Sequence, residues 1–183
     1  MSGIEAQISS TILSKTFKKL KEHPLTNIYC TVGLIDKNNI YNWQCTLLGP
    51  NDSPYKGGYF QILIKFPIDF PQNGPEIIFN TPIFHLNVNP VKTKNEQLGH
   101  CCISTINFWN PETSIEDILV SVFGLFYAAN EESAYQGYGD EAINDFINNK
   151  EAYDKRVRYF TKKYANGIYQ NDNYQRWDFT YNE

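Results

Sequence analysis

The sequence predicts an α+β fold, in which an N-terminal helix precedes a four-stranded antiparallel meander sheet and C-terminal helices pack against that sheet. Apolar residues recur at helical spacing before residue 23, alternate with polar residues between about 30 and 79, and return to helical spacing after 114. A length of 183 residues is typical of one domain. We assign residues 1–165 to this domain and residues 166–183 to a polar and aromatic tail.

The first predicted element is an amphipathic helix, which should end before His23 because Pro24 disfavours helical conformation in the residue preceding it. Its apolar residues are Ile8, Ile12, Leu13, Phe17 and Leu20, and the interspersed basic residues are Lys15, Lys18, Lys19 and Lys21. The basic side is either a solvated face or a docking surface for an acidic partner.

Four runs of alternating or apolar residues predict the sheet, at about 30–34, 41–47, 60–66 and 77–79. Short connections, such as the turn at 37–39, favour antiparallel neighbours. Cys30 and Cys45 fall in phase with the apolar residues, so we expect both to pack in the core.

The C-terminal part is predicted to be helical. Ser114 and Asp117 have the spacing of a capping box, and an apolar stripe follows between Ile118 and Ala129. A Gly- and Tyr-rich break at 135–139 precedes a helical stretch at about 140–165, which we expect to be interrupted near residues 148–149.

Composition excludes several classes of function. A net charge of −4 argues against nucleic acid or an anionic membrane as the main partner. No run is long enough to span a bilayer, and the N-terminus lacks the apolar core of a signal peptide, so we expect a cytoplasmic or nuclear protein. We also expect it to be a monomer. Its four cysteines should then be free thiols. Without Cys-x-x-Cys or a Gly-rich phosphate loop, neither a metal nor ATP is expected.

The adjacent pair Cys101 and Cys102 is the most informative local feature. A thiol is the strongest nucleophile available near neutral pH, although the pair alone favours the simpler interpretation of two small buried thiols. A cysteine hydrolase with His85 or His100 as base is a further alternative. His100 lies too near in sequence to adopt triad geometry easily, and the sequence shows no acid to orient either histidine.

Six motifs, in this order along the chain, resemble those of the ubiquitin-conjugating enzymes, and the resemblance covers about residues 11–165. They are the strand and turn at 43–50, "SPYxGGxF" within 52–60, "FPxDYP" at 66–71, His85-Leu86-Asn87 in place of His-Pro-Asn, "GxICL" at 99–103, and "WSP" at 109–111. By the family's register Cys102 is the active cysteine, and Cys101 replaces a packing residue.

The resemblance implies that Cys102 accepts the C-terminus of ubiquitin, or of a related modifier, from an activating enzyme as a thioester. A lysine of a protein substrate would then attack this thioester, usually with the help of a ligase. ATP would be used by the activating enzyme alone. A catalytically inactive relative that binds ubiquitin or scaffolds a complex is the alternative function.

The resemblance also assigns roles around Cys102. Asn87 is the expected oxyanion donor or organiser of the active site, whereas a simple turn residue is the alternative for it. His85 is expected to hold its loop and not to act as a base. Further support for the active site is expected from Ser104, Asn130, Glu132 and Ser133.

This sequence departs from the family pattern at several of these positions. Leu86 replaces the proline, Ser104 replaces a common Asp, and Ser133 stands where many members have an acid that orients the incoming lysine, a role that Glu132 would then take. The gap between Asn87 and Cys102 is wider than in typical members. We expect the polar excess within 88–98 to form a loop beside the active site.

The family's partner-binding surfaces map onto three segments. Lys15, Lys18 and Lys19 match the first-helix surface that meets the activating enzyme. Pro71 with Gln72, and Asn110 with Pro111, match the two loops that ligases grip. Gln72 and Asn110 depart from the usual residues, so we expect ligase binding to be weakened or redirected.

Overall fold

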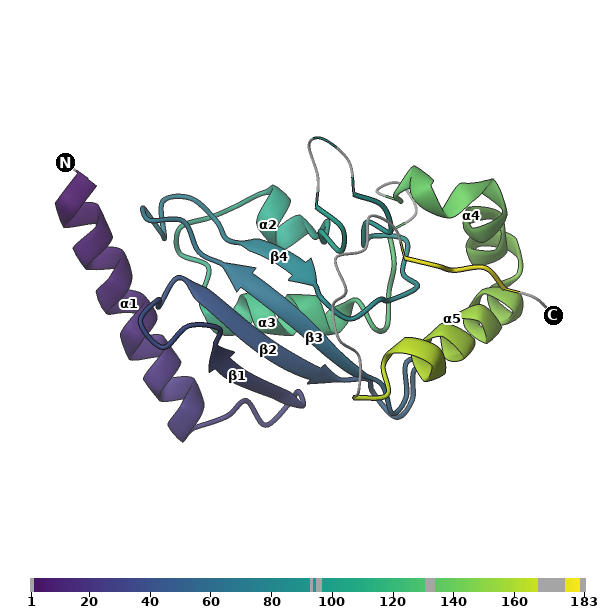
Figure 1. The fold of residues 1–183 in the computed structure, drawn as a ribbon, viewed down its shortest axis with the longest axis horizontal. Coiled ribbons are helices and arrows are strands. Elements are labelled where there is room, and N and C mark those ends of the chain that lie inside the picture. The colour runs from purple at the N-terminus through teal and green to yellow at the C-terminus, as the bar shows by residue number, and fades with distance from the viewer. Residues whose placement is uncertain (1, 93, 95–96, 131–133, 168–176, 182–183) are drawn as a thin grey trace.

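The computed structural model describes residues 2–92, 94, 97–130, 134–167 and 177–181. A central sheet lies between helices (Figure 1), which confirms the predicted α+β fold. The elements are α1 (Ser2–Glu22), β1 (Cys30–Leu34), β2 (Asn42–Leu48), β3 (Tyr59–Lys65), β4 (Glu76–Phe79), α2 (Ser104–Asn107), α3 (Ile115–Gly124), the 3₁₀ turn η2 (Gln136–Tyr138), α4 (Gly139–Asn148) and α5 (Lys150–Tyr164).

The sheet is a meander in which β1, β2, β3 and β4 pair in that order, each antiparallel to the next. One row of paired residues, Val32, Cys45, Ile62 and Phe79, crosses all four strands and is buried throughout. Because side chains alternate between the two faces of a strand, this register confirms the phase that the apolar residues predict. Cys30 is only half-buried at the start of β1.

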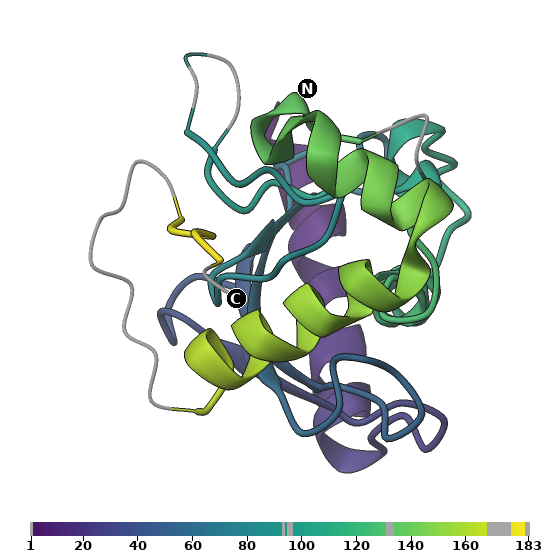
Figure 2. The ribbon, with the colours of Figure 1, turned by 90° about the vertical axis from the view of Figure 1, so that its right-hand side faces the viewer.

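The helices cover the sheet from different sides. In Figure 1, α3 crosses behind the strands, whereas α1 and the α4–α5 pair lie at opposite ends of the molecule. Seen from the α4–α5 end, α1 is on the far side (Figure 2). Asn149 ends α4 and caps α5 by accepting a hydrogen bond from the backbone of Ala152, so the predicted interruption is confirmed. No helix in the described part of the chain is long and apolar enough to cross a membrane.

The helix α3 begins where the sequence predicts, but it ends earlier than the predicted apolar stripe. Ser114 Oγ accepts from the Asp117 amide at 3.0 Å and the Asp117 carboxylate accepts from the Ser114 amide at 3.3 Å, which confirms the capping box. The helix stops at Gly124, well before Ala129. The Leu125 carbonyl instead accepts a hydrogen bond from His85, so the chain turns here, although Phe126 still reaches the core.

A short segment at 99–101 extends the sheet beyond β4. The Phe79 amide donates to the Gly99 carbonyl at 2.8 Å, and the Cys101 amide donates to the Ile77 carbonyl at 2.9 Å. On its other side the segment meets the chain at Val88, which pairs with Cys101 in an antiparallel bridge. The residues just before Cys102 are therefore part of a backbone ladder.

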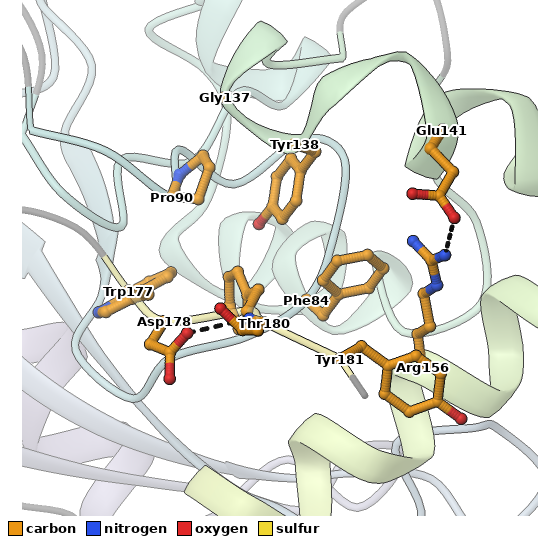
Figure 3. A pocket seen from close by; sticks show the side chains of 11 residues that line it. Phe84, Pro90, Gly137, Tyr138, Glu141, Arg156, Trp177, Asp178, Thr180 and Tyr181 are labelled. Carbon is orange, nitrogen blue, oxygen red and sulfur yellow. Dashed lines mark hydrogen bonds and ion pairs between the residues drawn. The ribbon is translucent and has the colours of Figure 1, made fainter. Parts of the chain in front are cut away.

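Part of the predicted tail packs on the body of the protein. Trp177 is buried, its amide donates to the Pro90 carbonyl at 3.1 Å, and Phe179 lies edge-on to Phe84 with ring centroids 5.4 Å apart. These residues border a cavity of about 520 Å³ beside α4 and α5 (Figure 3). The domain boundary at residue 165 stays a prediction.

We predict that Gly99→Ala destabilises the fold by about 3 kcal/mol or more, as measured by urea unfolding. Gly99 has φ +79°, and a Cβ atom there would lie 2.0 Å from the Phe79 carbonyl oxygen. The matched control is Gly57→Ala, because Gly57 has φ +77° with nothing within 4 Å of the added atom. This control should cost only about 1 kcal/mol, and equal costs for the two variants would contradict the close approach.

Candidate active site

Cys102 follows directly on the added ladder and lines a cavity of about 300 Å³. Its amide donates to the Asn87 carbonyl at 2.9 Å, and its side chain is half-buried. The other residues around the cavity come from α2, α3 and the two segments that flank them. They are Asn87, Ile103, Ser104, Thr105, Asn107, Ser121, Gly124, Leu125, Ala128, Ala129 and Asn130.

Cys101 has the opposite environment. In the extended ladder successive side chains point to opposite faces, and Cys101 is 2% exposed within the core. Burial raises the pKa of the Cys101 thiol far above its usual value. Since the thiolate is the reactive form, Cys102 is the member of the pair that is placed for chemistry.

Asn87 joins the two sides of the cavity. Its side chain is buried, with Nδ2 donating to the Asn130 carbonyl and Oδ1 accepting from the Asn130 amide, both at 2.7 Å. This pair of bonds holds the segment after α3 against the segment at 85–89, to which the Cys102 amide is bonded. Asn87 therefore bonds to the backbone of a distant segment, and its role as oxyanion donor or organiser stays a prediction.

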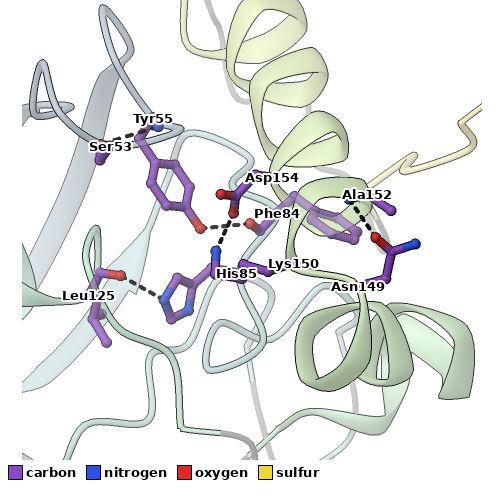
Figure 4. Close-up of polar contacts among 9 residues, drawn as sticks. All are labelled: Ser53, Tyr55, Phe84, His85, Leu125, Asn149, Lys150, Ala152 and Asp154. Carbon is purple, nitrogen blue, oxygen red and sulfur yellow. Dashed lines mark hydrogen bonds and ion pairs between the residues drawn. The ribbon is translucent and has the colours of Figure 1, made fainter.

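His85 is a buried, neutral histidine (Figure 4). Its Nδ1 accepts from the Asn87 amide at 3.1 Å, so Nε2 carries the proton that bonds to the Leu125 carbonyl at 2.9 Å. Burial lowers the pKa of His85 to about 4, against the opposing effect of its backbone hydrogen bonds, and the charge of Lys150 makes a smaller contribution in the same direction as burial. With both ring nitrogens engaged, His85 is suited to hold its loop and not to act as a base.

The remaining predicted support residues are only partly brought together. Ser104, at the start of α2, and Asn130 are exposed at the rim of the cavity. Glu132 and Ser133 lie outside the described residues. His100 Nδ1 lies 3.0 Å from the hydroxyl of Tyr135, away from the residues that line the cavity.

Backbone bonds join the two ends of the segment between Asn87 and Cys102, of which residues 93, 95 and 96 lie outside the described residues. Asn89 donates to the His100 carbonyl at 2.9 Å and accepts from the Gly99 amide at 2.8 Å. Beyond these bonds, Pro90 packs against Gly137 of η2, where a Cβ atom would lie 2.9 Å from the proline ring. Leu86, in the place of the family's proline, is fully buried.

Two residues near the site were not singled out from the sequence. Asn107 Nδ2 donates to Cys102 Sγ at 3.0 Å, because the single turn of α2 brings the two side chains together. The Tyr138 hydroxyl lies within hydrogen-bonding distance of the carbonyl oxygens of Val88 (2.9 Å) and Ile83 (3.1 Å). The sequence signalled only a break at 135–139, and no helix at 104–107.

Comparison with known proteins places this arrangement in a family. Residues 12–161 match the family model described as "Ubiquitin-conjugating enzyme". The chain is 35% identical over 132 residues to the probable ubiquitin-conjugating enzyme E2 31 of Arabidopsis thaliana, which covers 72% of this chain and 79% of that protein. It is 31% identical over 169 residues to the ubiquitin-conjugating enzyme E2 15 of Schizosaccharomyces pombe, covering 85% and 94%.

The chain belongs to the ubiquitin-conjugating enzyme family.

Membership of this family implies interaction with ubiquitin, an activating enzyme and a ligase. Lys15, Lys18 and Lys19 are exposed on α1, and Lys19 forms an ion pair with Glu116 at the start of α3, with 2.7 Å between Nζ and Oε1. The hydrogen bond and charge of Glu116 raise the pKa of Lys19. This ion pair ties the basic helix to the element that follows the second ligase loop.

The two expected ligase loops are joined to each other. Trp109 Nε1 donates to the Pro71 carbonyl at 2.8 Å, and its ring lies 5.9 Å from that of Phe70. Beside this contact, Gln72 is exposed in the first loop, and Asn110 and Pro111 are exposed in the second. One tryptophan therefore positions both loops as a single unit.

We predict that protonation of His85 destabilises the fold below neutral pH. His85 has a pKa of about 4 in the folded protein and 6.5 when unfolded. The contribution of the neutral imidazole to the free energy of unfolding is therefore complete above pH 6.5 and is lost as the pH falls toward 4. The loss should be on the order of 3 kcal/mol. Urea unfolding at a series of pH values measures it as the difference between wild type and His85→Gln.

The variant removes this titration, while the side-chain amide of the introduced glutamine can still donate to the Leu125 carbonyl, so its stability should fall less steeply over the same range. If the variant does not fold, NMR titration of the wild-type imidazole gives the same information. A His85 resonance that titrates near its unfolded value would contradict the prediction.

Proposed function

We propose that this chain is an active conjugating enzyme that carries ubiquitin, or a related modifier, as a thioester on Cys102. The observation that carries the proposal is the half-buried thiol of Cys102 on the wall of a cavity, next to a second thiol that is buried and inert. Membership of the family and the match of Cys102 to its active-cysteine register support this choice of residue.

The proposed reaction consists of two acyl transfers. In the first, the Cys102 thiolate attacks the thioester carbonyl of the charged activating enzyme, a new C–S bond forms, and the thiolate of the activating enzyme leaves. In the second, a substrate amine attacks the Cys102 thioester, a C–N bond forms, and the Cys102 thiolate leaves while the amine gives up a proton. No cofactor bound to this chain is needed, since ATP is used by the activating enzyme.

Asn87 contributes to both steps by fixing the cavity wall. Its two bonds to Asn130 keep the segment after α3 at a set distance from Cys102. Among the described residues that line the cavity, Cys102 alone has an ionisable side chain. By the family's register, we assign the orientation of the incoming lysine to Glu132, whose neighbour Ser133 replaces the usual acid.

The proposed partners follow from the exposed surfaces. The basic side of α1 would meet the activating enzyme, and the loops joined by Trp109 would meet a ligase. The exposed Gln72 and Asn110 favour a ligase surface that is more polar than the one that most members of the family meet. We propose that the protein acts as a monomer in the cytoplasm, the nucleus or both.

A charging assay tests the proposal. Wild type, Cys101→Ala and Cys102→Ala are incubated with activating enzyme, ATP and ubiquitin, and analysed on a non-reducing gel. We expect a band that a reducing agent removes in wild type and Cys101→Ala, and its complete loss in Cys102→Ala, because the latter lacks the attacking thiol.

Cys101→Ala is the matched control, since it removes the adjacent thiol. A band that persists in Cys102→Ala and disappears in Cys101→Ala would reverse the assignment. A wild type that remains uncharged by ubiquitin, and by a panel of related modifiers with their own activating enzymes, would overturn the proposal in favour of an inactive binding module.

A further inference from the structure

We propose that Asn107 is a further catalytic residue, which donates its side-chain amide to the reacting sulfur of Cys102 and so stabilises the thiolate. The role of this contact in modifier transfer rests on the proposed function. Its effect on the thiol of Cys102 is independent of that function. The observation is the 3.0 Å contact between Asn107 Nδ2 and Cys102 Sγ.

The position of Asn107 is fixed by its own helix. Within the turn of α2, the Asn107 amide donates to the Ile103 carbonyl at 2.9 Å, and the next amide, from Phe108, donates to Ser104 at 2.9 Å. The Thr105 hydroxyl donates to Ser121 Oγ on α3, also at 2.9 Å. This bond ties α2 to α3, and the Asn107 amide, although exposed, lies beside the sulfur before any substrate arrives.

Among the described residues, Asn107 supplies the one side-chain hydrogen bond to the sulfur of Cys102. Reactive cysteines are commonly activated by a nearby cation, such as a histidinium or a lysine. Here the described lining holds no cation, and its only ionisable group is Cys102 itself. The neighbouring thiol, Cys101, is buried and neutral. A donated N–H favours the charged form of the group that accepts it, which here is the thiolate.

Asn87 and Asn107 therefore have different tasks. The Asn87 amide is engaged with the backbone of Asn130, which fixes the cavity wall. The Asn107 amide contacts the reacting atom itself.

The effect applies to both proposed acyl transfers. A larger thiolate fraction increases the amount of nucleophile in the first step. In the second step the Cys102 thiolate is the leaving group, and a stabilised thiolate leaves faster. No oxidant or further reactant is involved, and no bond to Asn107 is made or broken.

The first test measures the rate at which iodoacetamide alkylates Cys102 across a pH series, with tandem mass spectrometry assigning the label to this residue. We expect Asn107→Ala to move the midpoint of the pH profile upward by roughly 0.5 to 1 pH unit. Asn107→Asp should move it further upward, because a carboxylate repels the thiolate. Asn38→Ala is the matched control, since Asn38 is exposed in the turn between β1 and β2.

The second test follows the discharge of the Cys102 thioester to free lysine, which should slow by roughly three- to tenfold in Asn107→Ala. Thermal unfolding midpoints equal to that of wild type show that each variant is folded. An unchanged alkylation midpoint in folded Asn107→Ala would overturn the proposal. So would a lower midpoint, because the carbonyl of Asn107 would then face the sulfur.

Failure of this inference is distinguishable from failure of the proposed function. Alkylation needs neither ubiquitin nor an activating enzyme. A shifted alkylation midpoint in a protein that never forms a thioester would support the contact of Asn107 with Cys102 while overturning the conjugating activity.

Discussion

The arrangement of the site depends on the backbone ladder that holds residues 99–102 between β4 and the segment at 87–89. The bonds from Phe79 to Gly99, from Cys101 to Ile77 and from Cys102 to Asn87 leave little freedom to the backbone that carries the thiols. Alternation along this ladder sends Cys101 into the core and Cys102 into the cavity. A slip of one residue would exchange them, so the pairing register selects which thiol faces the cavity.

A second layer of the site is a buried polar connection between residues 85–87 and 125–130. Neither His85 nor Asn87 reaches bulk water, and each finds its partners in the backbone of the other segment or in its neighbour. Buried polar groups are costly unless they are paired, so the two segments hold each other in place. This pairing also ends α3 early, because the Leu125 carbonyl is taken by His85.

The sequence predicts those features that depend on the spacing of apolar residues or on a helix-capping motif. The phase of Cys45 and Ile62 follows from alternation, and the start of α3 follows from Ser114 and Asp117. The Asn107 contact depends on a single turn of α2, too short to leave a period in the sequence. Trp177 bonds to Pro90 and its neighbour Phe179 packs against Phe84, both far away in sequence, and no local pattern encodes such contacts.

The long loop after Asn87 shows how the family fold accommodates variation near its chemistry. Asn89 bonds to both His100 and Gly99, so the extra residues begin and end at one closed point. Lengthening such a loop is cheap, since each doubling costs only about 0.6 kcal/mol in closure entropy. The ladder beneath it is unaffected, because its hydrogen bonds join residues on either side of the closed point. Sequence change can therefore accumulate in the loop while the ladder fixes the positions of Asn87 and Cys102.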